Sequence, residues 1–349
     1  MLRQRTRRND VSIATWISSS NRTMVFFLRR NGEMAFWISK MTSFSIGSVV
    51  ETVSGQRVHE LKLQQQETPF IADTNGDFDM GHIYVQEFRL QQPTTPIPLL
   101  LWHGGGLTGS VWEQNADGAP GWMTRSLERG HDVFCCDAVG MGRSSWAHLP
   151  SLYNKQPIFR SKGEAWSLFR IGTPQSYSSR RAFTGSQFPV ENFDSFTRLI
   201  VPRWTDMDEM NINAYNQLVK RVGPCAIVAH SSAALYAYEA LRRWPNLVRA
   251  ICLVEPGFAP PWEIGMANNL LRDTPVLQIF ADNIAGHDHW ETHWRRARAG
   301  FDNFPRHPQS RWLDLPEEDI FGNTHCPMSD SNSDQILDIV LDWLESLPQ

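Results

Sequence analysis

The sequence predicts an α/β protein in which helices cover both faces of a mostly parallel central sheet, with an additional segment inserted over it. Two observations predict this class: strand-like and helix-like runs alternate from about Gly55 onward, and most strand-like runs are continuously apolar. A third is the break in this alternation between Trp146 and about Trp204. The 349 residues, 41% of them hydrophobic, can bury a core of that size.

Before this break, the predicted core contains three strands. "GHIYVQEFRL" (81–90) alternates apolar and polar residues, which is typical of a half-buried antiparallel strand. "IPLLLWH" (97–103) and "HDVFCCDA" (131–138) are continuously apolar, which indicates strands buried on both faces. A helix is predicted between these two runs, over residues 123–129.

After the break, the same alternation continues. Buried strands are predicted for "CAIVAH" (225–230), "VRAICLVE" (248–255) and "PVLQIFAD" (275–282), and a last strand near residues 312–315. Helices are predicted over 232–243 and 334–344. The resulting division is an N-terminal extension (1–45), an N-terminal core segment (46–146), an inserted cap (147–207) and a C-terminal core segment (208–349).

The N-terminal extension is rich in Arg and Ser, with Asp10 as the only acid among its first thirty residues. This composition resembles a mitochondrial transit peptide, but a disordered extension or an upstream start codon is the preferred interpretation. No apolar run approaches the roughly 20 residues of a membrane helix. We therefore predict a cytoplasmic protein, with a mitochondrial location as the alternative.

The composition also limits the partners. The net charge of −4 argues against a dedicated nucleic-acid binder. The five cysteines form no CxxC pair and are predicted to be buried free thiols in a reducing compartment. His287, His289 and His293 have spacing that suits metal chelation, but an exposed helix start explains them as well, so neither a metal nor a cofactor is predicted.

Parallel sheets place their sites at the carboxyl ends of the strands, where three turns stand out. The first is Gly104-Gly105-Gly106, whose backbone N–H groups are candidates for an oxyanion hole, preceded by His103. The second, residues 137–144, lacks the spacing of a dinucleotide fingerprint and is interpreted as a structural loop. The third contains Ser231 and Ser232.

Ser231 is the better nucleophile candidate because a nucleophile elbow needs small residues two positions before and after it. Those positions hold Ala229 and Ala233 for Ser231, whereas Ser232 would place the imidazole of His230 there. Ser232 then contributes its backbone N–H to the oxyanion hole.

A serine nucleophile needs a base and an orienting acid. His325 lies after the last predicted strand and before the last helix, which favours it over the earlier histidines at 287, 289 and 293. Glu255 and Asp282 each end a buried strand between Ser231 and His325, so both are candidates for the acid.

Six stretches resemble the α/β-hydrolase superfamily from about residue 50 onward, and more narrowly the bacterial Ser-His-Glu esterases and their fungal relatives. They are "LLLWHGGGLTGSVWE", "GHDVFCCDAVGMGRSSW", "VAHSSA", "LVEPG", "PVLQIFAD" and "GNTHCPMSDSNSDQILDIVLDWL". The resemblance implies the α/β-hydrolase fold and favours Glu255 over Asp282. It also matches His325 to the histidine of a G-N-x-H motif, while Ala233 stands where such elbows usually have glycine.

These residues predict a serine hydrolase that cleaves a carboxylic ester or a lactone, both small-molecule substrates, through an acyl-enzyme. Trp166, Phe169 and Phe183 of the cap are expected to bind substrate, with Phe159, Arg160 and Arg170 nearby. One alternative keeps the triad in an acyltransferase, cyclase or C–C bond hydrolase of secondary metabolism. The other is a catalytically inactive binding protein; the oligomeric state is not predicted.

Overall fold

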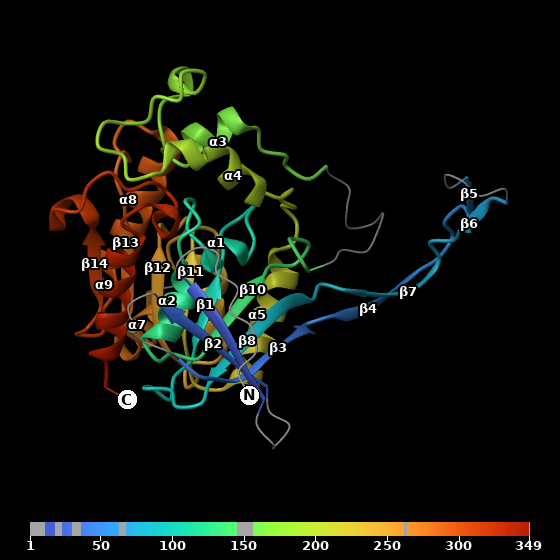
Figure 1. The fold of residues 1–349 in the computed structure, drawn as a ribbon, viewed down its shortest axis with the longest axis horizontal. Coiled ribbons are helices and arrows are strands. Elements are labelled where there is room, and N and C mark those ends of the chain that lie inside the picture. The colour runs from blue at the N-terminus through green and yellow to red at the C-terminus, as the bar shows by residue number, and fades with distance from the viewer. Residues whose placement is uncertain are drawn as a thin grey trace.

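Eight strands form the central sheet in the order β14-β13-β12-β11-β9-β10-β8-β3 (Figure 1). The computed structural model describes residues 11–17, 23–29, 36–62, 68–144, 156–261 and 264–348. The strands are β3 (Ile38–Ile46), β8 (Ile83–Leu90), β9 (Leu99–Trp102), β10 (Val133–Asp137), β11 (Cys225–His230), β12 (Val248–Val254), β13 (Val276–Phe280) and β14 (Arg311–Asp314). All seven strands predicted from the sequence are present, and β3 is additional.

Strands β14 to β10 run parallel to their neighbours, whereas β8 is antiparallel to β10 and β3 is antiparallel to β8. Side chains alternate along β9 between two hydrophobic cores, so Leu99 and Leu101 lie in one core while Leu100 and Trp102 lie in the other. Both sides of β9 are therefore buried, as its continuous apolar run predicts.

Helices cover each face of the sheet. One core includes buried residues of α1 (Ser110–Glu113), α2 (Trp122–Glu128) and α9 (Ser333–Glu345). The other includes α5 (Asp208–Val222), α6 (Ala233–Arg243) and α7 (Ile264–Asp273). The predicted helices at 123–129, 232–243 and 334–344 correspond to α2, α6 and α9. No helix in the described regions of the chain is long and apolar enough to cross a membrane.

The inserted segment consists of short helices over the carboxyl ends of the strands (Figure 1). Its described residues, 156–207, include α3 (Lys162–Leu168), α4 (Phe193–Phe196) and the 3-10 turns η1 (Pro174–Ser176), η2 (Val190–Asn192) and η3 (Thr197–Leu199). Its backbone bonds to the loops that follow the strands: Phe169 O accepts from His325 N, and Val201 N donates to Gly106 O, both at 2.9 Å. Helix α8 (Asp288–Asn303) lies beside it.

Two features of the N-terminal region differ from the prediction. Strand β3 belongs to the central sheet, so the sheet begins at residue 38 rather than after the predicted boundary at 45. Within the predicted disordered extension, β1 (Val11–Ile17) pairs antiparallel with β2 (Thr23–Arg29). Most of the Arg-rich start and the beginning of the cap (145–155) lie outside the described residues.

A long ribbon then leaves the body between β3 and β8 (Figure 1). It contains two antiparallel pairs, β4 (Val49–Val53) with β7 (Gly76–Met80) and β5 (His59–Leu61) with β6 (Phe70–Ala72). Each of these pairs is mostly exposed and buries little apolar surface. The ribbon therefore lacks the apolar pattern of a buried strand, and the sequence predicts no strand there.

Candidate active site

Ser231 occupies a strained turn between β11 and α6. Its φ is 53°, the left-handed region that non-glycine residues rarely adopt. Neighbouring strand ends hold this backbone: Ser231 N donates to Val254 O (2.9 Å), and Ser231 O accepts from Gly257 N (3.2 Å). Ala229 and Ala233, the two positions that must be small, are both fully buried. The turn therefore has the features of a nucleophile elbow.

His325 contacts both Ser231 and Glu255. Its Nε2 lies 3.0 Å from Ser231 Oγ, and its Nδ1 lies 2.9 Å from Glu255 Oε2. With Nδ1–H donating to the carboxylate, Nε2 is free to accept the serine proton. The sequence separations of 94 and 70 residues show that only folding brings these groups together.

A buried carboxylate fixes the loop that carries His325. Asp330 is fully buried and accepts hydrogen bonds from Asn323 Nδ2 (3.0 Å), Thr324 N (2.8 Å) and Thr324 Oγ1 (2.9 Å). The two residues immediately before His325 are therefore held by Asp330, which limits the positions that the imidazole can adopt.

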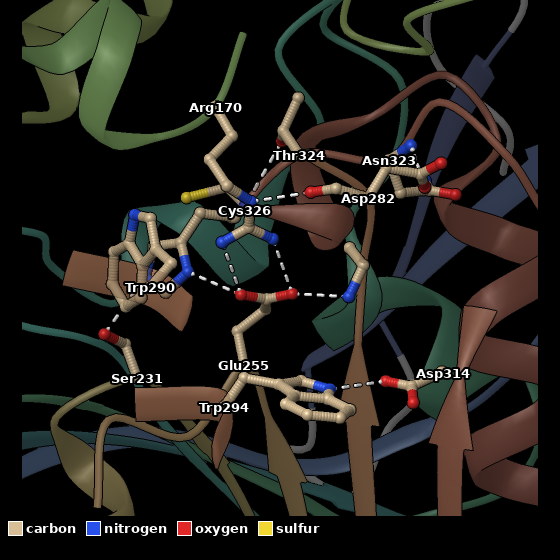
Figure 2. Close-up of polar contacts among 12 residues, drawn as sticks. Arg170, Ser231, Glu255, Asp282, Trp290, Trp294, Asp314, Asn323, Thr324 and Cys326 are labelled. Atoms are coloured by element: carbon tan, nitrogen blue, oxygen red, sulfur yellow. Dashed lines mark hydrogen bonds and ion pairs between the residues drawn. The ribbon is translucent and has the colours of Figure 1, made fainter. Parts of the chain in front are cut away.

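The two acid candidates have different environments. Glu255 follows β12, is 1% exposed and faces the imidazole. Asp282 instead directs its carboxylate to the backbone N–H of Asn323, at 3.0 Å (Figure 2). Glu255 is thus the acid that this geometry pairs with His325.

Arg170 comes from the inserted segment and binds the same carboxylate (Figure 2). Its Nη1 and Nη2 donate to the two oxygens of Glu255, at 2.8 and 2.7 Å, while its Nε donates to Asp282 O, at 2.7 Å. Its side chain is fully buried. Burial by itself raises the pKa of Glu255, but the charge of Arg170 and the hydrogen bond from His325 outweigh burial and lower that pKa to about 2. Glu255 is therefore ionised throughout the neutral range.

The prediction for Arg170 is thus corrected. The sequence analysis grouped it with cap residues that shape substrate choice, but its guanidinium is buried against Glu255. A lone arginine in a segment of mixed composition gives no sequence signal for a buried ion pair. The residue that pairs with it is 85 positions away.

Aromatic rings cover the imidazole of His325. Phe169 is nearly parallel to it at 6.0 Å between centroids, and Trp290 of α8 lies at 3.8 Å. Burial lowers the pKa of His325 to about 4, and the hydrogen bond and charge of Glu255 oppose this shift only in part. The imidazole is consequently neutral at pH 7, as a general base must be. Sequence reasoning misses Trp290, because the residues around it indicate only an exposed helix start.

The predicted oxyanion turn packs against the elbow. A Cβ on Gly104 would lie 2.6 Å from His230 Nδ1 and 2.9 Å from Ser231 Cβ, so only glycine fits there. His230, which the sequence analysis used only as a bulky neighbour, donates from Nε2 to His325 O at 2.8 Å. It thereby links the residue before Ser231 to His325. Burial lowers the pKa of His230 to about 3, so it too is neutral.

The aromatic residues predicted to bind or flank the substrate differ in their burial and contacts. Trp166 is fully buried within the inserted segment, where its Nε1 donates to Ser176 Oγ at 3.1 Å, so it packs rather than lining the site, contrary to the prediction. Phe169 is 4% exposed and covers His325, while Phe183 is partly buried and Phe159 is 69% exposed.

The remaining sequence candidates serve structure. Asp137 is buried and accepts from Gly109 N and Arg143 N, both at 2.7 Å, which closes the loop at 137–144. All five cysteines are free and buried. Among the described residues, no group of three His, Cys, Asp or Glu side chains is placed to hold a metal ion.

Comparisons with known proteins agree with this architecture. The model of the "Alpha/beta hydrolase family" matches residues 99–342. A "Probable secreted lipase phiG" from Fungal sp. (strain ATCC 74256) is 26% identical over 322 residues, 77% of this chain and 87% of the relative. The structure of a bacterial esterase is 25% identical, with a TM-score of 0.76 over 89% of this chain and 96% of the other. The predicted superfamily resemblance and fold class are confirmed.

Proposed function

The chain belongs to the alpha/beta hydrolase family, and from this membership we propose that it hydrolyses carboxylic esters or lactones through an acyl-enzyme on Ser231. The predicted class of enzyme, an α/β-fold serine ester hydrolase, is confirmed by the family together with the lipase and esterase relatives. The observation that carries the assignment of residues is the continuous contact from Ser231 through His325 to Glu255 at a left-handed turn.

In the proposed reaction, His325 Nε2 takes the proton of Ser231 Oγ as that oxygen attacks the substrate carbonyl. Glu255 holds the imidazole in the correct tautomer and stabilises its cation. His325 then protonates the leaving alcohol, and a water molecule activated by the same imidazole releases the acid. Each proton thus moves through Nε2, while Nδ1 stays bonded to Glu255.

The oxyanion of the tetrahedral intermediate is proposed to bind the Ser232 amide and an amide of the turn at residues 104–106. Supporting this, Gly104 packs directly on Ser231, and Ser232 is the N-cap residue of helix α6, whose N-terminal dipole favours negative charge. Such amides contribute roughly 3 kcal/mol each to transition-state stabilisation. The inserted segment is proposed to act as a cap, since Phe169 and Arg170 contact the triad residues directly.

Labelling with a fluorophosphonate probe tests the nucleophile. We expect covalent labelling of the wild-type protein and none of Ser231→Ala, with Ser232→Ala as the matched control that still reacts. Equal labelling of Ser231→Ala contradicts the assignment. Aryl esters of increasing acyl length and simple lactones then test the reaction. Labelling without turnover on any of them favours acyl transfer, cyclisation or C–C cleavage instead, and absence of labelling favours an inactive binding protein.

A cytoplasmic location is also proposed, supported by the five free, buried cysteines. The fungal relative is named as secreted. Fractionation of cells that express the full chain distinguishes cytosol, mitochondria and medium.

A further inference from the structure

Arg203 lies against the predicted oxyanion turn. A Cβ placed on Gly105 would come within 2.6 Å of the Arg203 guanidinium, so the charged group lies across that glycine. The backbone of Arg203 is fixed by reciprocal hydrogen bonds with Ile158, of 2.8 and 3.0 Å. Within the described residues, its guanidinium donates no hydrogen bond and forms no ion pair. A partly buried cation is thus left to be satisfied by something else.

A small cavity connects Arg203 with the nucleophile turn. The cavity has a volume of about 50 Å³, and Gly104, Gly105, Arg203 and Ser232 line it together with Tyr236 and Asp208. A volume of this size accommodates a few water molecules or a compact polar group, not a long acyl chain. Because Ser232 lines the same cavity, a group bound there lies next to the residue that follows Ser231.

Among the described residues, neither acid near the cavity forms an ion pair with Arg203. Arg160, the neighbouring cation, has its own acid, since its Nη1 donates to Glu164 Oε1 at 2.6 Å. Asp208, the acid of the cavity wall, accepts the hydroxyl of Tyr236 at 2.7 Å. Burial lowers the pKa of Arg160, and the positive charge of Arg203 adds to that effect although Glu164 opposes it. The two arginines therefore repel each other, and an anion at Arg203 would relieve both.

We propose that Arg203 binds a carboxylate of the substrate, so that the preferred substrate is an ester or lactone that also carries a free carboxylate. A carboxylate matches the planar guanidinium in two parallel hydrogen bonds and fits the small cavity. A neutral lipid would leave Arg203 unpaired. The inference rests on the proposed function and specifies its substrate class.

The test compares monoethyl and diethyl esters of succinic, glutaric and adipic acid, with hydrolysis followed in a pH-stat at pH 7. We expect the wild-type kcat/KM to be at least about tenfold higher for one monoethyl ester than for its diester. Arg203→Met should lower this ratio about 10- to 100-fold, the effect of losing a hydrogen-bonded charge, and Arg203→Lys should restore some of it. Arg198→Met, at an exposed arginine of the same segment, is the matched control and should keep the ratio.

A measurement on the wild-type protein covers the case in which Arg203→Met does not fold. Glutarate should slow fluorophosphonate labelling of Ser231, whereas uncharged glutaramide at the same concentration should not. Equal effects of the two compounds, or a mono-to-diester ratio near one, overturn the carboxylate subsite while labelling itself upholds the proposed function. Absence of both labelling and ester turnover instead defeats the proposed function.

Discussion

Strands β11 and β12 are neighbours that end with the same backbone geometry, and the protein uses the two ends differently. Ser231 and Glu255 both have φ of 53°. Each donates its backbone N–H to the next strand, Ser231 to Val254 O at 2.9 Å and Glu255 to Ile279 O at 2.8 Å. Ser231 then presents a partly exposed hydroxyl, whereas the side chain of Glu255 is 1% exposed.

The difference between the ends lies in what compensates the strain. At Ser231 the compensation is local, since Ala229 and Ala233 are small and α6 begins directly afterward. At Glu255 it is distant, since Arg170 neutralises the carboxylate and Ala281 N donates to it. A left-handed strand end therefore supports either a nucleophile or a buried acid, depending on which partners the fold brings.

The largest loss of activity is expected from a substitution at the exposed strand end, Ser231. Ser231→Ala removes the proposed nucleophile and should lower kcat on an aryl ester by roughly 10⁵- to 10⁶-fold. Ser232→Ala keeps the backbone amide of the proposed oxyanion hole, so its kcat should fall by less than about tenfold. Steady-state kinetics measure both, with circular dichroism to show that each variant is folded. Comparable losses in the two variants would mean that the elbow does not select Ser231.

The second-largest loss of activity is expected from a substitution at the buried strand end, Glu255. Glu255→Gln cannot stabilise the imidazolium and leaves Arg170 without its counter-charge, so kcat should fall about 10⁴-fold. Asp282→Asn keeps an oxygen that can accept from Asn323 N and should lose far less. The same kinetic assay compares the two variants. The reverse ranking would assign the acid to β13.

Removing Arg170, the distant partner of Glu255, tests what stabilises the buried strand end. Arg170→Met strands an ionised carboxylate in the core, and a loss of about 3–5 kcal/mol in the free energy of unfolding is expected. The double variant Arg170→Met/Glu255→Gln removes both charges and should recover much of this stability while staying inactive. Urea denaturation provides the values. A stable single variant, or no recovery in the double variant, would show that the ion pair does not compensate this strand end.

The smallest expected effect is the pH dependence of the two histidines that connect the strand ends. A histidine in the unfolded chain has a pKa near 6.5. In the folded protein, burial lowers the pKa of His325 to about 4 and the pKa of His230 to about 3. Below pH 6.5 the unfolded state therefore binds protons that the folded state does not. The stabilisation by neutral histidines is complete above pH 6.5 and is lost as the pH falls, by about 2 kcal/mol per histidine at pH 5.

Melting temperatures between pH 4 and 8 measure this loss, and His230→Gln should flatten the slope. The acid limb of kcat/KM should lie near pH 4, where His325 takes up its proton. An acid limb near pH 6.5 together with a pH-independent melting temperature would mean that these imidazoles are solvated rather than buried.

The sequence by itself determined the parallel sheet and singled out Ser231 as the proposed nucleophile, because both inferences depend on local patterns. Continuous apolar runs fix which strands are buried, and the alanines flanking Ser231 select it by size. Chain order placed His325, and the family resemblance favoured Glu255 over Asp282.

Only the tertiary structure decided what surrounds these residues. Arg170, Trp290 and Arg203 carry no motif, and their roles depend on contacts through space, which in the case of Arg170 and Glu255 join residues 85 positions apart. Burial makes Trp166 a core residue and Arg170 a structural cation, although both looked suited to substrate binding. Electrostatic and ring interactions depend on distance and desolvation, which a linear pattern of residue types does not encode.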